Sequence, residues 1–464
     1  MKQQVQQAIA TRPWARWTVL AIVSFTMMTG YLVAKEMSPL QYLLETSPSG
    51  GGMGWSSSEF GLFAGARGFF NVFLLMLFFS GVILDKMGVR FTGILSCVLM
   101  LVGAGAIYGA VTMLSPEPTC NPTLLGISLL GGEVKVQVVV AALGFALFGI
   151  GYEMCGITVS KVIVKWFTGK EMALAMGLQV AMARLGTALA LSCSPMIASS
   201  YGLSMPILLG GLSVGVGLIA YLVYCMMDRQ GEAAGLLVSD VASAGDDEKF
   251  HLRDLLTTLR NPGFWLITLL CLFYYSALYP FLDFATKLMI AKYGVEPKFA
   301  GLIPAILPFG SIILTPLFGA MYDRRGHGAT IMIVGSVMLT VVLAVFALPL
   351  NSSWIAITLM SILGIAFSLL PAALWPAVPK IVPMKQLGTA YSIIYYIQNI
   401  GLMVIPIWIG QVLAADTVGE SVDYTRSLWI FTGIGICAII VAVLLLAADR
   451  RNHYGLETVS RDES

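Results

Sequence analysis

Two charged residues lie in the middle of long apolar stretches of this sequence. Glu153 stands in FGIGYEMCGITVSKVIV, and Arg184 stands in EMALAMGLQVAMARLGTALALS. A charge in the hydrocarbon core of a membrane costs at least about 3 kcal/mol, so such residues usually face a bundle interior and mark a binding site or a pathway. A carboxylate and a guanidinium together would bind the amino group and the carboxylate of one substrate.

The spacing around the loop 166–171 predicts that both charges lie at the same depth. Glu153 lies thirteen residues before this loop, and Arg184 lies thirteen residues after it. Equal distances from the loop of an antiparallel helical hairpin place two residues at one level. Small residues line helix contacts or cavities rather than facing lipid. The small residues that share a helix face with one of the two charges are Gly149, Gly156, Ser160, Gly177, Ala181 and Ala188. We therefore expect both charges to point inward, as a substrate site or as a structural salt bridge.

Aromatic and amide side chains in later apolar stretches are further candidates for this site. Tyrosine and tryptophan join an apolar face to a hydrogen-bonding group, and a buried amide needs a partner from another helix or from a ligand. We predict that the substrate contacts, besides Glu153 and Arg184, the residues Tyr274, Tyr275, Tyr279, Trp375, Tyr395, Gln398 and Asn399. Plain packing or an interfacial aromatic belt is the alternative. Pro280 and the prolines of 371–383 predict interrupted helices.

Arg67 is a third cation within an apolar stretch, and we treat it as an auxiliary candidate for the site. The alternative is that Arg67 reaches the lipid headgroups or pairs with Glu59 or Glu36. Glu153 is the only acidic residue deep within a stretch, so it is the natural proton acceptor if transport is coupled to protons.

The elements that must hold these residues are membrane-spanning helices. The chain has 464 residues, of which 58% are hydrophobic and 11% charged, with a mean hydropathy of +0.85. Soluble domains are about 25% charged, and a membrane-spanning helix needs about 20 apolar residues. We predict an all-α membrane protein whose twelve spans lie near 16–41, 57–82, 91–113, 134–163, 172–197, 204–226, 263–290, 299–321, 328–350, 354–379, 387–414 and 427–448.

The placement of lysine and arginine predicts the orientation of these spans. Most of the 27 basic residues fall on one side, which the positive-inside rule makes cytoplasmic, with both termini on that side. The net charge of +2 then reflects topology and gives no sign of a nucleic acid partner. The three histidines and seven cysteines follow no metal-ligand or disulfide pattern. We expect no metal, no cofactor and no enzymatic activity.

A repeated motif predicts that the chain consists of two halves. The polar stretch 228–261 reads as a cytoplasmic linker between six spans in residues 1–227 and six in residues 262–464, the second half ending in a short tail. GVILDKMGVR after the second span and GAMYDRRGHG after the eighth both fit Gly-x-x-x-Asp-[Lys/Arg]-x-Gly. The aspartates of this motif can accept hydrogen bonds from helix N-termini and pair with cations. We assign a gating role to Asp85, Lys86, Arg90, Asp323, Arg324 and Arg325; the alternative is that they only fix topology.

Two such motifs in a six-plus-six layout resemble the major facilitator superfamily over essentially the whole chain. The resemblance implies two pseudo-symmetric six-helix bundles, a central cavity near the bilayer midplane and alternating access. The strings FGIGYEMCGITVSKVIVKWFTGKEMALAMGLQVAMARLG, FYYSALYPF, ALWPAVPKIVPMKQLGTAY and IQNIGL are similar to one branch, the lysosomal dipeptide transporters. That resemblance implies that Glu153 and Arg184 contact the two termini of short peptides moved by uniport. Tyr395 and Tyr396 depart from the pattern of the branch, so the pocket differs in size.

The first hypothesis is therefore a carrier of dipeptides or similar zwitterions. A second is a proton-coupled carrier or exporter of small organic anions or drugs, in which Glu153 is the proton site. A third is a membrane receptor or scaffold, which should tolerate changes in the cavity. We expect a monomer in the lipid bilayer, in a bacterial plasma (inner) membrane rather than a lysosome, with a small-molecule substrate. Nothing in the sequence points to a partner subunit.

Overall fold

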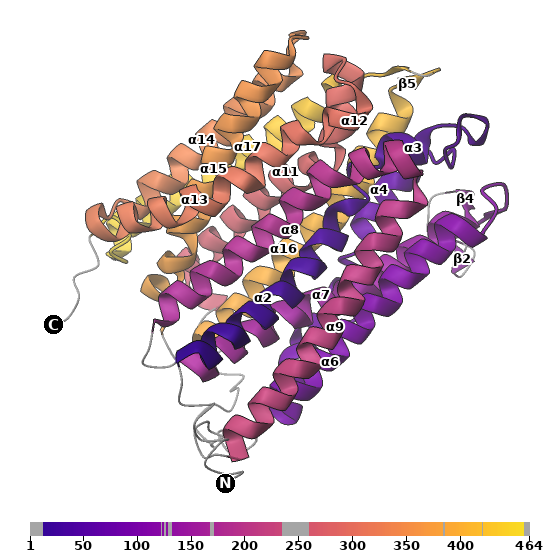
Figure 1. The fold of residues 1–464 in the computed structure, drawn as a ribbon. Helices are drawn as coiled ribbons and strands as arrows, with labels where there is room; N and C mark the ends of the chain where they lie inside the picture. The colour runs from indigo at the N-terminus through magenta and orange to yellow at the C-terminus, as the bar shows by residue number, and fades with distance from the viewer. Residues whose placement is uncertain are drawn as a thin grey trace. The chain divides into compact units, whose positions relative to one another are not determined.

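The computed structural model describes residues 13–121, 123–124, 127–128, 132–167, 171–233, 259–383, 386–419 and 421–458. Most of these residues are helical (Figure 1). Eleven helices in these ranges are long and apolar enough to cross a membrane, which confirms the prediction of an all-α membrane protein. The chain divides into two compact units, Met1–Trp55 with Ala66–Glu248, and Ser56–Gly65 with Lys249–Ser464.

The first unit is built around helix α2, which packs against α7, α8 and α9, while α6 packs against α7 and α9. Short antiparallel strand pairs, β1 with β4 and β2 with β3, lie between α6 and α7. The elements of this unit are α2 (Pro13–Glu36), α3 (Gln41–Glu45), the 3-10 turn η1 (Pro48–Gly50), α5 (Phe69–Phe73), α6 (Met76–Met113), β1 (Thr119–Cys120), β2 (Thr123–Leu124), β3 (Ile127–Ser128), β4 (Val134–Lys135), α7 (Val136–Phe167), α8 (Met172–Tyr201) and α9 (Ser204–Ala233).

The second unit pairs α13 with α15, α14 with α15 and α17, and α11 with α16 and α17. Asn261 caps the start of α11, where its side chain accepts a hydrogen bond of 2.9 Å from the backbone N–H of Gly263. The elements of this unit are α4 (Ser57–Ala66, all but its last residue), α11 (Pro262–Tyr293), α12 (Pro297–Ala300), α13 (Leu302–Arg325), α14 (Gly328–Ala347), α15 (Ser353–Ile381), α16 (Leu387–Ala415), β5 (Thr417–Val418), β6 (Ser421–Val422) and α17 (Thr425–Asn452).

The expected second span, 57–82, is not a single helix. It is divided among α4, α5 and the start of α6, with breaks after Ala66 and at Leu75, which has a φ of 52°. Helix α6 then continues through the first repeated motif, and only Gly88 leaves helical geometry there, with a φ of 75°. Glycine adopts this conformation without steric penalty, so a single residue makes the turn for which we had expected a loop.

Pro280, Pro371, Pro376 and Pro379 do not interrupt their helices, so the prediction was wrong for them, whereas α15 ends at Ile381, before Pro383. Helix α11 continues past Pro280, and α15 runs through Pro371, Pro376 and Pro379. Packed neighbouring helices and local adjustments satisfy the carbonyl groups that a proline leaves without a donor, which is why membrane helices tolerate proline.

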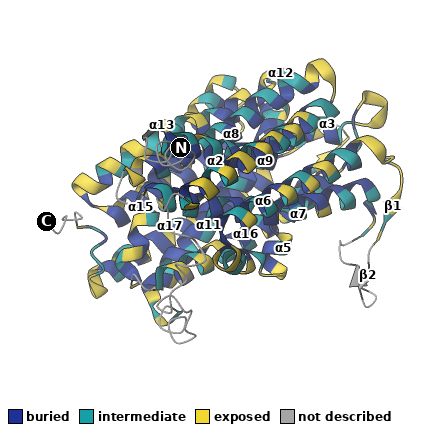
Figure 2. Ribbon diagram, turned by 60° about the horizontal axis from the view of Figure 1, so that its bottom comes forward, coloured by how far each residue is buried: buried dark blue, intermediate teal, exposed yellow. Residues whose placement is uncertain are grey.

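The long helices present buried residues along one face and exposed residues along another (Figure 2). In the first unit, Tyr221 is fully buried, its ring fills the space beside Gly93, and its hydroxyl donates a 2.9 Å hydrogen bond to the carbonyl of Val89. This contact ties α9 to the turn at Gly88. Helix α9 also extends beyond the expected start of the linker, since Asp228–Ala233 are helical.

Candidate functional site

Helix α2 packs against both helices that carry the intramembrane charges, α7 and α8. Its Tyr31 ring lies 4.9 Å from the ring of Tyr152, the neighbour of Glu153 on α7. On its other side, a Cβ at Gly186 of α8 would overlap the backbone of α2 at Met28. Because Tyr31 lies less than one turn from Met28, Glu153 and Arg184 flank the same stretch of α2.

Both charged side chains keep part of their surface accessible. Glu153 and Arg184 are half-buried, whereas their helices also carry fully buried apolar residues such as Met154 and Ala183. Helices α7 and α8 both pack against α2.

The broken second span docks onto α7 one turn away from Glu153. The guanidinium of Arg67 lies over the Tyr152 ring, 5.4 Å from its centroid. The amide of Asn71 donates a 3.3 Å hydrogen bond to the carbonyl of Gly149, and a Cβ at Gly149 would overlap the carbonyl oxygen of Arg67. The auxiliary candidate Arg67 thus lies beside the neighbour of Glu153, at the break between α4 and α5.

The tyrosines of α11 differ in their exposure. Tyr275 and Tyr279 stack with their centroids 5.5 Å apart, and Phe367 of α15 packs edge-on against Tyr279 at 5.9 Å. Tyr279 is half-buried, Tyr275 is 3% exposed, and Tyr274 is fully enclosed. Of the three, Tyr279 has the surface that a ligand would need, while Tyr274 contributes to packing.

A second aromatic group joins α15 to α16. Trp375 stacks on Tyr395 with centroids 5.0 Å apart, and its ring lies 6.0 Å from that of Tyr391. The Tyr391 hydroxyl donates a 3.3 Å hydrogen bond to the carbonyl of Trp375. Tyr395 is 37% exposed, so this stack presents an aromatic edge at its surface.

The two buried amides of α16 have protein partners. Gln398 is 8% exposed, and its carbonyl oxygen accepts a 3.4 Å contact from the thiol of Cys271 on α11. Asn399 is 4% exposed, and its amide donates a 3.0 Å hydrogen bond to the carbonyl of Tyr395. Both side chains therefore satisfy part of their hydrogen-bonding capacity within the second unit.

The first repeated motif makes two different ionic contacts. Asp85 pairs with Lys161 of α7 at 2.7 Å, with the Asp85 side chain 72% exposed. Arg90, at the end of the motif, pairs with Glu232 of α9 at 2.7 Å. Lys86 is exposed. The motif is thereby attached to α7 and α9, its neighbours in the same unit.

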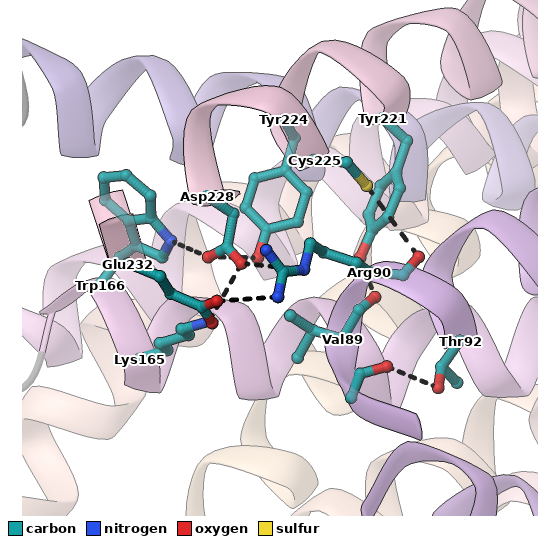
Figure 3. A network of polar contacts seen from close by, with 11 residues as sticks. Val89, Arg90, Thr92, Lys165, Trp166, Tyr221, Tyr224, Cys225, Asp228 and Glu232 are labelled. Carbon is teal, nitrogen blue, oxygen red and sulfur yellow. Dashed lines mark hydrogen bonds and ion pairs between the residues drawn. The ribbon is translucent and has the colours of Figure 1, made fainter. Parts of the chain in front are cut away.

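Arg90 belongs to a buried network that joins α6, α7 and α9 (Figure 3). Its centre is Asp228, whose side chain is fully buried and lies 3.0 Å from the ammonium of Lys165 and 3.7 Å from the Arg90 guanidinium. The Trp166 indole donates to Asp228 at 3.1 Å. Two carboxylates and two cations balance here, because Glu232 contacts Lys165 at 2.7 Å as well as Arg90.

Sequence reasoning missed this network because we had assigned Asp228 to the linker. A usable signal exists in the spacing: Tyr224, Asp228 and Glu232 follow one another every four residues, so they share one face of a helix. Lys161 and Lys165 repeat the same interval on α7. Two polar helix faces of opposite charge predict a contact between the helix ends.

The second repeated motif leaves its charges at the surface. Asp323, Arg324 and Arg325 are exposed, and Gly326 ends α13 with a φ of 70°. The chain after α17 instead holds this end of the unit. Leu456 is fully buried, and Glu457 contacts the first turn of α14.

Glu457 caps helix α14. Its carboxylate accepts hydrogen bonds of 2.8 Å from the Thr330 N–H and 2.9 Å from the Thr330 hydroxyl, and its other contact is His327 Nδ1 at 3.0 Å. Burial raises the pKa of Glu457, but the hydrogen bonds from Thr330 and His327 outweigh burial and hold this pKa below its usual range. The carboxylate is therefore stabilised in its charged form at the positive end of the helix.

The described ranges contain no group of three or more histidine, cysteine, aspartate or glutamate side chains that could hold a metal ion. The polar groups of the candidate site are charged, aromatic and amide side chains, which bind organic solutes by ion pairing, stacking and hydrogen bonding.

Comparison with known proteins places these features in context. A sequence model described as Major Facilitator Superfamily matches residues 17–406 and 289–461. The lysosomal dipeptide transporter MFSD1 of Gallus gallus is 31% identical over 315 residues, which cover 65% of this chain and 67% of that protein. The protein of the same name from Bos taurus is 32% identical over 288 residues, or 60% of this chain and 59% of its own length.

These matches span about two thirds of the relatives' length or less. Among solved structures, a mutant of the nucleoside transporter NupG superposes with a TM-score of 0.69 and covers 93% of this chain and 98% of that chain. Its sequence identity is 14%, so this likeness concerns the fold alone.

Proposed function

Because the chain belongs to the major facilitator superfamily, and is thus an integral membrane transporter and not an enzyme, we propose that it carries small zwitterions, above all dipeptides. Transport would proceed by alternating access and uniport. The observation that carries the proposal is the position of Glu153 and Arg184, which flank one stretch of α2 with part of each side chain accessible. The names of the relatives support the choice of dipeptides.

The two charges match the two ends of a dipeptide. A carboxylate such as Glu153 pairs with an ammonium group, and a guanidinium such as Arg184 binds a carboxylate through two parallel hydrogen bonds. Both groups occur in every dipeptide, whatever its side chains. A site built on the termini alone therefore binds many dipeptides with little side-chain selectivity.

The sequence also predicts substrate contacts from aromatic residues that lie in the second unit. Tyr279 and the Trp375–Tyr395 stack have accessible surface that would contact the substrate side chains. Aromatic faces accept apolar groups of different shapes, and tyrosine hydroxyls add hydrogen bonds where the ligand is polar. Tyr275, Gln398 and Asn399 would support this surface from behind, since each is almost fully buried.

The repeated motifs would serve the gate on the side that we propose to be cytoplasmic. Asp85 is the member of the first motif best suited to exchange partners, because its pair with Lys161 is exposed. Arg90 is held by Asp228 and Glu232 and would act as the fixed end. Lys86, Asp323, Arg324 and Arg325 are exposed charges that could contact a neighbouring segment when the gate closes.

Thermal unfolding of the purified protein in the presence of candidate ligands tests the proposal. A ligand that binds only the folded state raises the melting temperature by mass action. We expect stabilisation by many dipeptides, none by the same dipeptides with an acetylated amino group, and none in Arg184→Ala or Glu153→Gln. Stabilisation by organic acids but not by dipeptides would refute the dipeptide assignment and leave the family membership intact.

A carrier of small organic anions, coupled to protons, is the second candidate. Arg67 favours it, because its guanidinium lies over Tyr152 beside Glu153 and adds a second cation to the neighbourhood of the site. In such a carrier, Arg67→Gln would lower the affinity for the anion and a substrate amino group would be unnecessary.

We place the transporter in a bacterial plasma membrane, as a monomer with both termini in the cytoplasm. The excess of lysine and arginine in the segments assigned to that side supports the orientation. Labelling of a single cysteine introduced in the segment before α2 with a membrane-impermeant reagent, in intact cells, tests it; labelling would show that this segment lies outside.

A further inference from the structure

Glu36, the last residue of α2, has its side chain enclosed in the first unit. The residue is 2% exposed, and its carboxyl oxygen Oε2 makes no hydrogen bond with any residue that the structure describes. Gly210 of α9 provides the space for it, because a Cβ at this position would overlap the carboxyl group of Glu36. The carboxyl group of Glu36 is therefore enclosed at the contact between α2 and α9.

No cation balances this group in the part of the chain that the structure covers. On α9, the nearest charged residue is Asp228, eighteen residues beyond Gly210, which corresponds to about 27 Å along a helix. Lys35 precedes Glu36 directly, so it points about 100° away around the helix. The other charged residues on helices that contact α2 are Arg16 of α2 itself, Asp85, Lys86 and Arg90 of α6, Glu153, Lys161 and Lys165 of α7, Arg184 of α8, and Arg229 and Glu232 of α9.

None of these side chains forms an ion pair or hydrogen bond with Glu36 in the described ranges, nor does a tyrosine or cysteine of the same helices. The nearby short helix α3 carries Glu45, which accepts a 2.7 Å hydrogen bond from Gln41. Beyond it, Lys135 donates to the carbonyl of Gly54. The carboxyl group of Glu36 thus lies against Gly210 of α9, and its Oε2 has no hydrogen-bond donor among the described residues.

An ionised carboxylate enclosed without a partner loses its hydration and gains nothing in return, so such a group takes up a proton and becomes neutral. We propose that Glu36 is a proton-binding site of this transporter, occupied at neutral pH, and that loss of its proton stops transport. The second part rests on the proposed function. Glu153 is the only acid that the sequence pointed to as a proton acceptor, and Glu36 is a different one.

The link to transport runs through α2. Glu36 lies five residues from Tyr31, or about 7.5 Å along the helix. Tyr31 contacts α7 beside Glu153, and Met28 contacts α8 close to Arg184. A charge at Glu36 would have to leave its contact with Gly210 or draw water into it. Either change moves the end of the helix that supports both charges of the proposed site.

Infrared spectroscopy of the protein in lipid bilayers tests the proton site. A protonated carboxyl group has a C=O stretching band that ionised carboxylates lack. We expect this band at neutral pH in the wild type and in the control Glu133→Gln, an exposed acid, and its loss in Glu36→Gln. Glutamine has the shape of the neutral acid, so the variant should fold. A band of unchanged intensity in Glu36→Gln would refute the proposal.

The wild type provides a test that needs no variant. The band should disappear as the pH is raised, because the ratio of ionised to protonated acid rises about tenfold per pH unit. Absence of any such band between neutral and acidic pH would also refute the proton site.

Uptake of a dipeptide into liposomes at several pH values tests the consequence for transport. Wild-type uptake should fall as the pH rises through the range in which the band disappears, whereas Glu36→Gln should keep its uptake at high pH. The same pH profile in both proteins would refute the link to transport. If the wild type takes up no dipeptide at any pH, the proposed function fails, and the infrared band still decides the protonation of Glu36.

Discussion

Replacement of Asp228 by asparagine should destabilise the first unit through the loss of one buried charge. Asp228 is fully buried, with the ammonium of Lys165 at 3.0 Å and the Arg90 guanidinium at 3.7 Å. Asparagine keeps the shape of the side chain and can still accept from the Trp166 indole. The substitution therefore removes the charge and little else.

The size of the effect follows from the network around this residue. Removing one partner of a buried ion pair costs about 3–5 kcal/mol, because the other charge stays buried without compensation. Glu232 still contacts both cations at 2.7 Å and is itself 15% exposed, so it compensates in part. We therefore expect a loss near the lower end of this range, about 3 kcal/mol of unfolding free energy.

Thermal unfolding in detergent, followed by tryptophan fluorescence, measures this loss. One kcal/mol shifts the melting temperature of a domain of about 150–250 residues by about 2–4 °C, so Asp228→Asn should lower it by about 6–12 °C. Asp85→Asn is the matched control, because its pair with Lys161 is exposed and such pairs contribute about 1 kcal/mol at most.

Equal shifts in Asp228→Asn and Asp85→Asn would refute the reasoning that burial makes the difference. The double variant Asp228→Asn/Lys165→Gln provides a second check, since it removes one charge of each sign. Its destabilisation should be smaller than the sum of the two single effects, because the residues contact each other. Strict additivity would show that the Asp228–Lys165 pair does not stabilise the fold.

Two further predictions concern the second unit. Gly61→Ala should destabilise it by about 1–3 kcal/mol, because the added Cβ would overlap the carbonyl oxygen of Pro406. Gly433→Ala in α17 of the same unit, with open space around it, should not, and equal melting temperatures for the two variants would contradict this. Glu457 should stabilise the protein above pH 4.5, the ordinary pKa of a glutamate, because its folded-state pKa is lowered, and this contribution should vanish as the pH falls through that lower value. The melting temperature of the wild type should therefore exceed that of Glu457→Gln near neutrality, and the difference should shrink on acidification; a difference that does not change with pH would disprove the role of the charge.

Hydropathy predicted the membrane helices well where each span is one continuous helix. The expected segment 328–350 agrees with α14, Gly328–Ala347, and 204–226 agrees with the first part of α9. The second span differed because hydropathy is averaged over about 20 residues. Such an average does not detect breaks at Arg67 and Leu75, since the residues on both sides are equally apolar. The breaks depend on docking against α7 and α16, which lie far away in the sequence.

The sequence also revealed some of the charged residues important for this protein and missed others. Glu153 and Arg184 could be found because a charge within an apolar stretch is costly and therefore informative. Asp228 escaped notice because it begins a polar stretch, where one more charge carries no signal. Its partners Lys165 and Arg90 lie 63 and 138 residues away, so only the packing of α6, α7 and α9 reveals that it is buried.

The contrast between Asp228 and Glu153 bears on the alternative that Glu153 and Arg184 form only a structural salt bridge. A carboxylate that serves to fix helices in this protein is fully buried and has several donors, as Asp228 has in Lys165, Trp166 and Tyr224. Such a carboxylate has no oxygen left to accept a hydrogen bond from a ligand, because protein donors already occupy both of its oxygens. Glu153 and Arg184 instead retain accessible surface. We predict that water at that surface is exchanged for the ammonium and carboxylate of a substrate, an exchange that a fully enclosed carboxylate such as Asp228 does not allow.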